Sequence, residues 1–376
     1  MKKVVLIPDS FKGTVSSTEL CGIMKRQIQE HFPNCEVVSI PVADGGEGSV
    51  DAFLTALGGN KITVTVENPY FEPMEAFYGI IDNGSCAVIE MAACAGLPLV
   101  ENRKNPLLTT TYGVGKLIVH AAQSGVKKII VGLGGSATND AGCGAAAAAG
   151  IKFYNKNGES FIPTGGSLKD VAKIDTKDLH PSLNGVEIIT MCDIDNPMYG
   201  KSGAAYVFAP QKGADAAMVE SLDAGLLHLC EVIDKCIGTD LSQIPGGGAA
   251  GAMGAGMVAF FSSRLQMGIE TVLDTVNFDS LITDTDVIIT GEGKLDTQSL
   301  RGKVVIGVAR RAKAQSKPVI AIVGGADYGI DDAYDMGLTA VFPINRLPQD
   351  FEIIRAYSKE NVKFTIDNVV RLIKFL

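Results

Sequence analysis

The sequence predicts an α/β protein of two domains, in which the strands of a parallel sheet alternate with helices. At both ends of the chain, short continuous apolar runs alternate with longer segments of helical periodicity. Between these ends the composition shifts toward glycine and alanine. The 376 residues also exceed the size at which one hydrophobic core usually stops growing. A second domain is therefore expected in the middle of the chain.

The N-terminal segment predicts the order β-α-β-α-β. Val4–Ile7 is typical of a buried parallel strand that opens into the polar residues Asp9 and Ser10. N-capping residues follow, and apolar residues then recur at helical spacing until Phe32 and Pro33 end the helix. The next expected elements are a strand at 36–40, a helix at 48–57 and a strand at 62–66.

The C-terminal segment repeats this alternation, and the middle of the chain adds further strands. Expected near the C-terminus are a strand at 286–290, a helix at 304–315, strands at 318–323 and 339–342, and a helix at 361–375. Expected in the middle are strands at 86–91, 128–132, 186–192 and 205–208. Parallel sheets bind ligands beyond the carboxyl ends of their strands, so we look for chemistry in the loops there.

Composition and charge favour a cytoplasmic protein with small-molecule partners. A formal net charge of -9, with no basic run to offset it, argues against nucleic acid and anionic membranes as partners. No apolar run reaches the length of a membrane-spanning helix. The eight cysteines include no CxxC pair and are typical of reduced core cysteines. The four histidines lack ligand spacing, so zinc is not expected.

Loops that combine glycine, acid and hydroxyl residues follow several of the expected strands. Each one alone could be an ordinary turn, because Gly, Asp, Asn and Ser favour turns for backbone reasons. Their repeated position at strand ends favours function. The loops are 9–13, 44–48, 132–140, 192–197 and 291–296.

The loop 132–140 is the candidate phosphate cradle. Its glycines let the backbone approach an anion, and the N–H groups at the start of the alanine-rich segment 141–149 carry partial positive charge. The candidate phosphate-binding residues are Gly134, Gly135, Ser136, Thr138 and Asn139.

Other glycine motifs fit known nucleotide signatures less well. Gly200-Lys201-Ser202 ends like a Walker A loop, but Asp195 stands where its first glycine is needed. In the loop 132–140, Ala137 replaces the third glycine of a dinucleotide fingerprint. A GxGxxG at 246–251 follows no clear strand, so we interpret it as close helix packing.

Carboxylates at strand ends are candidate ligands or proton acceptors. Asp193 follows one apolar strand, and Glu292 and Asp296 follow another. Such groups could hold Mg²⁺ together with substrate phosphates or take a proton from a hydroxyl, and both roles suit phosphoryl transfer. A helix-capping role is the alternative, above all for Asp195. Candidate cations for an anionic substrate are Lys12, Lys294, Arg301 and Lys303, although exposed lysines are usually only solvated.

Six ordered segments resemble the signatures of bacterial glycerate kinases of the first class, which phosphorylate glycerate with ATP. They are the segments 8–13, 43–48, 132–140, 192–197, 208–214 and 291–296. The resemblance implies a Rossmann-like domain built from 1–67 together with 281–376, and a second α/β domain inserted at 68–280. It also implies an active site in the cleft between the domains. Two positions depart from the family pattern: Lys294 stands where arginine is frequent, and Ala141 where glycine is common.

The resemblance implies phosphorylation of D-glycerate to 2-phosphoglycerate or 3-phosphoglycerate in organic acid catabolism, with ATP and Mg²⁺, and allows a homodimer. Asp193 is the expected general base or metal-side carboxylate, and Lys12, Lys294 and Asp296 are expected to take part in catalysis. Glu292 is a further expected metal ligand. The expected substrate-binding residues are Asp9, Ser10, Asp44, Glu47 and Arg301. Two alternatives stay open, namely a kinase of another small hydroxy acid or sugar acid and a noncatalytic anion-binding protein.

Overall fold

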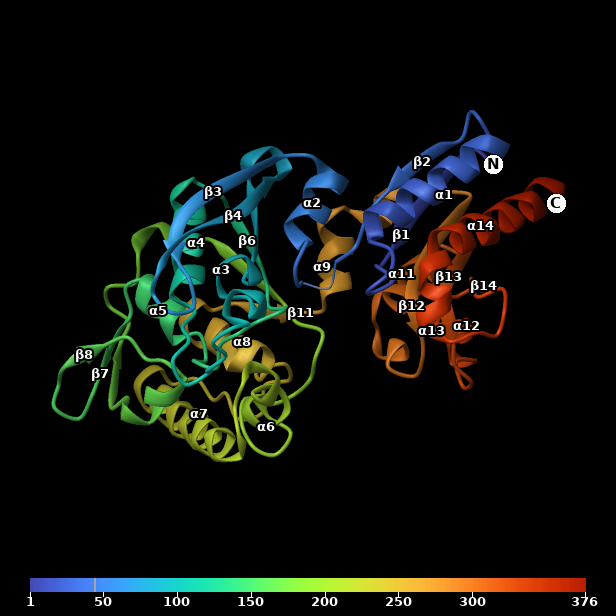
Figure 1. Cartoon of the computed structure of the whole chain (residues 1–376). Coiled ribbons are helices and arrows are strands. Elements are labelled where there is room, and N and C mark those ends of the chain that lie inside the picture. The colour runs from blue at the N-terminus through green and yellow to red at the C-terminus, as the bar shows by residue number, and fades with distance from the viewer. Residues whose placement is uncertain (44) are drawn as a thin grey trace. The chain divides into compact units, whose positions relative to one another are not determined.

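The computed structural model describes residues 1–43 and 45–376, which fold into two compact units (Figure 1). The first unit consists of Met1–Ala43, Asp51–Gly58 and Met267–Leu376. The second consists of Asp44–Val50 and Gly59–Gln266. The structure therefore shows an α/β protein with parallel sheets. The middle of the chain forms most of one unit, and segments from both chain ends form most of the other.

The first unit contains a five-stranded parallel sheet in the order β14-β13-β12-β1-β2. Its strands are β1 (Lys3–Pro8), β2 (Glu36–Ser39), β12 (Val287–Leu295), β13 (Val319–Ala326) and β14 (Ala340–Pro343). Its helices are α1 (Ser17–His31), most of α2 (Ser49–Leu57), α9 (Gly268–Thr275), α10 (Phe278–Leu281), α11 (Val304–Lys313), α12 (Asp332–Asp335), α13 (Phe351–Ile354) and α14 (Ser358–Phe375). Both chain ends thus build one sheet.

Helices α1 and α14 lie side by side and cover one face of this sheet (Figure 1). Their apolar residues join a core with Val4 and Leu6 of β1 and Ile289 of β12. Val5 and Ile7 alternate onto the opposite face and are also fully buried, as expected for a sheet covered on both sides. A capping box between Ser16 and Glu19 starts α1.

The second unit contains a six-stranded mixed sheet in the order β11-β10-β6-β5-β4-β3 and a small three-stranded sheet, β8-β7-β9. Strands β5, β6, β10 and β11 run parallel, whereas β3 and β4 pair antiparallel. The strands are β3 (Asn60–Glu67), β4 (Pro73–Ile81), β5 (Cys86–Glu90), β6 (Lys128–Gly132), β7 (Lys152–Tyr154), β8 (Ser160–Phe161), β9 (Lys173–Asp175), β10 (Glu187–Met191) and β11 (Arg264–Gln266). The helices are α3 (Ala92–Ala95), α4 (Tyr112–Gln123), α5 (Cys143–Ala148), α6 (Ala204–Phe208), α7 (Ala216–Ile237) and α8 (Ala249–Phe261).

Several expected elements differ from the observed ones. The strand expected at 62–66 pairs antiparallel with β4 in the second unit, so it does not continue the first sheet. Residues 267–280 belong to the first unit, and the observed boundaries therefore differ from 67 and 281. The strand expected at 205–208 is wrong, because Ala204–Phe208 forms a helix. A short apolar run does not distinguish a strand from a buried helical turn.

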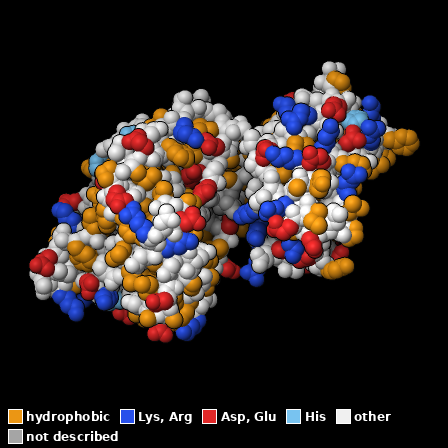
Figure 2. All heavy atoms as spheres, in the orientation of Figure 1, with side chains coloured by type: hydrophobic (Ala, Val, Ile, Leu, Met, Phe, Trp, Pro, Cys, Tyr) orange, Lys and Arg blue, Asp and Glu red, His pale blue; other side chains and the backbone are white. Residues whose placement is uncertain are grey.

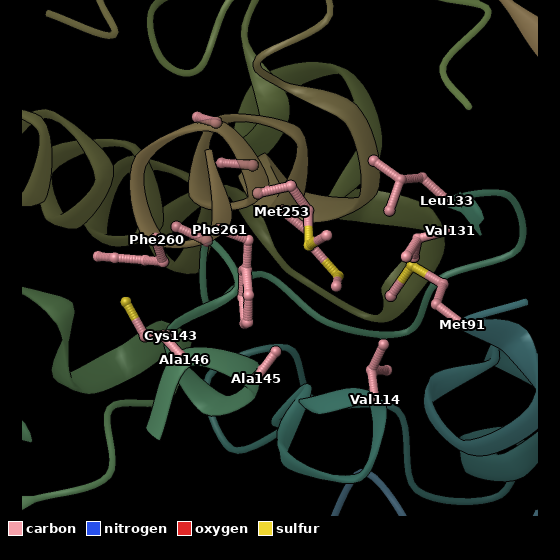
Figure 3. Close-up of a cluster of buried hydrophobic side chains, with 14 of the residues drawn as sticks. Met91, Val114, Val131, Leu133, Cys143, Ala145, Ala146, Met253, Phe260 and Phe261 are labelled. Atoms are coloured by element: carbon pink, nitrogen blue, oxygen red, sulfur yellow. The ribbon is translucent and has the colours of Figure 1, made fainter. Parts of the chain in front are cut away.

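Small residues let three helices of the second unit approach each other closely. A Cβ on Gly115 of α4 would lie 2.2 Å from the Ala145 carbonyl oxygen of α5. A Cβ on Gly256 of α8 would lie 2.0 Å from the Ala141 carbonyl oxygen, immediately before α5. Figure 3 shows Val114, Ala145, Met253 and Phe261 in the apolar cluster around this contact. The alanine-rich segment is therefore a packing surface in the core.

The surface carries charges of both signs. Figure 2 shows acidic and basic side chains interspersed over the face in view of each unit. Within residues 1–43 and 45–376, none of the helices combines the length and the apolar character that crossing a membrane requires.

Two glycine-to-alanine changes in helices should have opposite effects on stability. Gly115→Ala should lower the free energy of unfolding by about 2 kcal/mol or more, because its Cβ meets a backbone oxygen that cannot move away. Gly22→Ala in α1 should raise it by about 0.5–1 kcal/mol, because its Cβ meets only the mobile end of Arg26 at 3.6 Å. Denaturant unfolding of both variants measures this, and equal stabilities would contradict the packing argument.

Candidate active site

The carboxyl ends of β1 and β12 bring two acidic residues together in the first unit. Pro8 and Gly291 are partners in the parallel register, so Asp9 and Glu292 follow them on neighbouring strands. The Asp9 N–H donates to the Gly291 carbonyl oxygen at 2.8 Å, and the Asp9 carboxylate accepts from the Ser10 N–H at 2.6 Å. The expected gathering of polar groups at this sheet edge is thus present.

Glu292 is a buried carboxyl group at this edge. Its side chain is 6% exposed, and Oε1 has no hydrogen-bond partner among the described residues. Burial raises the pKa of Glu292 to about 7; a hydrogen bond from Ser299 lowers the pKa, and the negative charge of Asp9 raises it. A group in this state can hold a proton near neutral pH or bind a cation.

The segment 291–296 is a strand over most of its length and not the expected loop. β12 continues to Leu295, which pairs with Ala326 of β13. The glycines permit this pairing, because a Cβ on Gly291 would lie 2.2 Å from the Ile322 carbonyl oxygen. Gly293 leaves room for the 9–13 segment, since its Cβ would lie 3.5 Å from Phe11 Cα and 3.7 Å from the Lys12 nitrogen.

Lys294 and Asp296 each have a partner in the first unit. Lys294 Nζ lies 2.8 Å from Asp327 Oδ2, and about half of each side chain is exposed. Asp296 Oδ1 accepts from the Gln298 and Ser299 N–H groups at 2.9 and 3.2 Å. Asp296 therefore stabilises the start of the 3₁₀ turn Ser299–Arg301. Lys12 and Arg301 are exposed.

Two glycine loops of the second unit are packed backbone against backbone. A Cβ on Gly132 would lie 2.3 Å from the Gly45 carbonyl oxygen, and one on Gly134 would lie 2.4 Å from Gly46 Cα. The Gly134 N–H also donates to the Gly45 carbonyl oxygen at 2.9 Å. Glu47 is exposed, and its Oε1 would lie 4.0 Å from a Cβ on Gly135. Asp44, an expected substrate ligand, lies outside the described residues.

Backbone contacts fix the rest of the loop 132–140. The Leu97 N–H donates to the Gly135 carbonyl oxygen, and the Ala137 N–H donates to the Ala95 carbonyl oxygen, both at 2.8 Å. The Thr109 hydroxyl donates to the Ala137 carbonyl oxygen at 3.0 Å. Because Gly134 and Ala137 already donate within the protein, an anion at this loop would need other donors.

The helix start that was expected to attract an anion already holds a carboxylate of the protein. Asp140 is fully buried and accepts from the Thr111 N–H and hydroxyl at 2.8 Å each. It also accepts from the Gly144 and Gly142 N–H groups at 3.2 and 3.3 Å. Burial raises the pKa of Asp140, and these hydrogen bonds oppose the increase. Helix α5 is only six residues long, so its own dipole adds little.

Lys212 is a functional candidate that sequence reasoning did not single out. It lies in the 3₁₀ turn Pro210–Lys212 and is 1% exposed. Its Nζ donates to Ser136 Oγ at 2.8 Å and to the Thr138 carbonyl oxygen at 2.6 Å. Burial lowers the pKa of Lys212 to about 7, against the opposing effect of the Asp140 charge. The only sequence signal was its place in the motif 208–214, which does not reveal burial.

Thr138 and Asn139 belong to the loop 132–140 and are fully buried. Thr138 Oγ1 and both amide atoms of Asn139 find no hydrogen-bond partner in the part of the chain that the structure describes. A left-handed turn at 250–252 packs against them, and a Cβ on Gly251 would lie 2.0 Å from the Thr138 carbonyl oxygen. This contact confirms that the GxGxxG at 246–251 serves close packing.

Asp193 lies just beyond the carboxyl end of β10 and is partly buried. Met191 pairs with Gly132 in the parallel register, so Asp193 and the loop 132–140 leave the same edge of the sheet. Asp195 is exposed. Among the residues that the structure describes, no cluster of three or more His, Cys, Asp or Glu side chains could hold a metal ion.

Glu90 is a second residue that the sequence did not single out. It ends the apolar strand β5 and is 4% exposed. Its Oε2 accepts from the Val50 N–H in the first turn of α2 at 3.1 Å. An acid at the end of a continuous apolar run was the available signal, and its position adds a carboxylate to the edge where the loop 132–140 begins.

Acids, cations and glycine loops at the carboxyl ends of parallel strands define the class of α/β enzymes that handle charged small molecules. The comparisons narrow this class to one family. The family model described as "Glycerate kinase family" matches residues 4–374. The chain therefore belongs to the glycerate kinase family, whose members are phosphotransferases that act on an alcohol group.

Individual relatives agree with this assignment over nearly the whole chain. A glycerate kinase of Bacillus cereus is 43% identical over 99% of this chain and 98% of the relative. A glycerate 2-kinase of Escherichia coli K12 is 44% identical over 91% and 90% of the two chains. A crystal structure assigned as a glycerate kinase 2 of Salmonella typhimurium LT2 has a TM-score of 0.88 and 40% identity, covering 99% of this chain and 98% of the other.

Replacing Glu292 by glutamine should change how stability depends on pH. The pKa of Glu292 is raised from 4.5 to about 7, so the unfolded chain releases its proton at a lower pH than the folded chain. The stabilisation that the protonated Glu292 carboxyl contributes is fully present below pH 4.5 and is lost as the pH rises to about 7. Relative to that of Glu292→Gln, the free energy of unfolding of the native protein should fall by on the order of 3 kcal/mol between pH 4.5 and about 7.

Denaturant unfolding in metal-free buffer at several pH values between 4.5 and 7.5 measures this difference. Glu30→Gln, which changes an exposed glutamate of α1, is the control and should follow the native curve. Parallel curves for the native protein and Glu292→Gln would contradict the buried state of this carboxyl group.

Proposed function

We propose that this protein is a first-class glycerate kinase that transfers a phosphoryl group from ATP to D-glycerate, giving 2-phosphoglycerate in organic acid catabolism. The main support is the family membership together with similarity across almost the entire chain. The name of the Escherichia coli relative, glycerate 2-kinase, supports the 2-hydroxyl as acceptor. The absence of CxxC pairs and the need for ATP support a cytoplasmic location.

In the first unit, we assign the exposed cations to the charged substrates. Lys12 lies in the segment 9–13, beside Gly293, and Lys294 lies one residue farther along β12. Together with Arg301, they supply positive charge for phosphate or carboxylate oxygens. Asp9 and Ser10 supply polar groups next to Glu292 for substrate hydroxyls. Asp296 contributes by holding the turn that carries Arg301.

The residues of this edge fit Mg²⁺ as phosphoryl transfer uses it. Mg²⁺ is usually held by one or two carboxylates and substrate phosphates, so a complete protein cage is not required. Glu292 offers a buried oxygen without a partner among the described residues, and the charge of Asp9 raises its pKa further. A cation would relieve this repulsion. When bound, Mg²⁺ would neutralise negative charge on the transferring phosphoryl group.

In the second unit, we assign Asp193 as the general base that takes the proton of the acceptor hydroxyl. It leaves the same sheet edge as the loop 132–140. Ser136 and the backbone of Gly135 are the parts of this loop that we assign to phosphate, with Glu47 near Gly135 as a candidate contact for substrate hydroxyls. Gly134, Thr138 and Asn139 support the loop from within.

The proposed activity predicts ADP release that depends on D-glycerate, ATP and Mg²⁺ together. Phosphorus NMR of the product, recorded with proton coupling, should show a doublet, because C2 of glycerate bears a single proton. A triplet would show that the phosphate is bound through the CH₂ group at C3, and would rule out the 2-hydroxyl as the acceptor. ADP release only with another hydroxy acid would replace the substrate, and ligand-induced thermal stabilisation without ADP release would favour an anion-binding protein.

Replacing the proposed base should reduce turnover and leave binding nearly intact. Asp193→Asn keeps the size of the side chain and removes its proton affinity, so kcat should fall by about 10²–10⁴-fold with little change in KM. Asp170→Asn, at an exposed position of the same unit, is the control. Full turnover by Asp193→Asn would remove this residue from the mechanism.

A further inference from the structure

We propose that Lys212 is a positioning residue, which holds Ser136 so that the serine hydroxyl donates a hydrogen bond to an anionic oxygen bound at the loop 132–140. The inference rests on the proposed function, because it takes this loop to bind an anionic substrate group. Lys212 itself is 1% exposed, so it acts through the loop and not by touching a ligand.

Lys212 contacts two residues of the loop 132–140. Lys212 comes from the turn between α6 and α7, 76 positions away from Ser136 in sequence. Its Nζ donates to Ser136 Oγ at 2.8 Å and to the Thr138 carbonyl oxygen at 2.6 Å. Both contacts are made from within the unit. Lys212 thus fixes the side chain of one loop residue and the backbone of another.

The contact with Lys212 sets the polarity of the Ser136 hydroxyl. The ammonium form of Lys212 has three donors and no acceptor, so Ser136 Oγ accepts a hydrogen bond from it. The hydroxyl proton of Ser136 is then left to donate in another direction. Ser136 is 8% exposed and directly follows the exposed Gly135. Lys212 therefore converts a group that could donate or accept into a preorganised donor.

Several other donors at the loop are already used within the protein. The Gly134 and Ala137 N–H groups already donate to the Gly45 and Ala95 carbonyl oxygens. The start of α5 already holds the Asp140 carboxylate. The Ser136 hydroxyl consequently gains importance as a donor to a ligand. A preorganised donor is worth more than a free one, because the protein need not reorient it when the anion arrives.

The electrostatic environment of Lys212 also favours an anion near Ser136. A buried ammonium without a nearby anion is costly, and Asp140 is the acidic group whose charge favours it. Gly213, the residue after Lys212, packs against Lys104. A Cβ added to Gly213 would lie 2.6 Å from the Lys104 Cβ. An anionic ligand beside Ser136 would add to the attraction from Asp140 and would favour the ammonium form.

Two substrate groups share the required chemistry, namely a phosphate of ATP and the carboxylate of D-glycerate. Isothermal titration calorimetry with each compound alone measures binding without turnover. For one of the two compounds, Lys212→Met should raise the dissociation constant about tenfold. This is the loss of affinity expected when a hydrogen bond to a charged group is lost. Weaker binding of ATP would identify a phosphate as the group that Ser136 contacts, and weaker binding of D-glycerate would identify the carboxylate.

A double-mutant cycle separates positioning from simple structural support. Ser136→Ala should show the same tenfold loss, and the variant that combines both changes should bind no more weakly than Ser136→Ala alone. Lys235→Met, which removes an exposed lysine in the last turn of α7, should bind both compounds like the native protein. Melting temperatures of all variants show whether the second unit is folded.

Several outcomes would overturn the inference. They are unchanged binding of both compounds by Lys212→Met, losses that multiply in the combined variant, equal losses for both compounds, and a native protein that binds neither. If Lys212→Met does not fold, Ser136→Ala decides, and native binding by that variant overturns the inference. Absence of ADP release from the native protein would refute the kinase proposal alone, since the binding comparison needs no turnover.

Discussion

Steric contact between two glycine loops is the constraint on which the candidate site in the second unit depends. Gly132 and Gly134 meet Gly45 and Gly46 so closely that any side chain would collide with backbone atoms. Such a collision cannot be relieved by changing a rotamer, because the opposing atoms belong to the main chain. Glu47 is consequently brought close to Gly135, and the polar contacts of the loop 132–140 are built on a path that packing has already determined.

Buried polar groups then hold this path from within. Four hydrogen bonds satisfy Asp140, whose burial would otherwise be unfavourable. Lys212 has acceptors in Ser136 and Thr138. Strain accompanies these contacts, because Ala141 and the turn 250–252 adopt left-handed backbone conformations, with φ of 51° at Ala141. An alanine in this conformation costs about 1–2 kcal/mol relative to the right-handed region, a cost that glycine would avoid.

The sequence predicts the strand edges well because parallel strands place their carboxyl ends together, as Asp9 and Glu292 show. It predicts less well where one pattern has two physical causes. Gly291 and Gly293 resemble loop residues, yet they allow β12 to continue beside β13 and the 9–13 segment. Ala204–Phe208 is apolar enough for a strand, yet it forms a helix. The burial of Lys212 depends on a contact with Ser136, 76 positions away in sequence, and no local pattern records such a contact.

Burial divides the charged groups of the candidate sites by role. Lys212 and Asp140 are buried and hold backbone groups of the second unit. Lys12, Lys294 and Arg301 are exposed, where an incoming anion can reach them. The pair between Lys294 and Asp327 is half-exposed and therefore weak, so under the proposed function a substrate oxygen could replace Asp327 at small cost. Phosphoryl transfer relies on positioning and charge neutralisation, and under the proposed function the buried groups supply the first and the exposed groups the second.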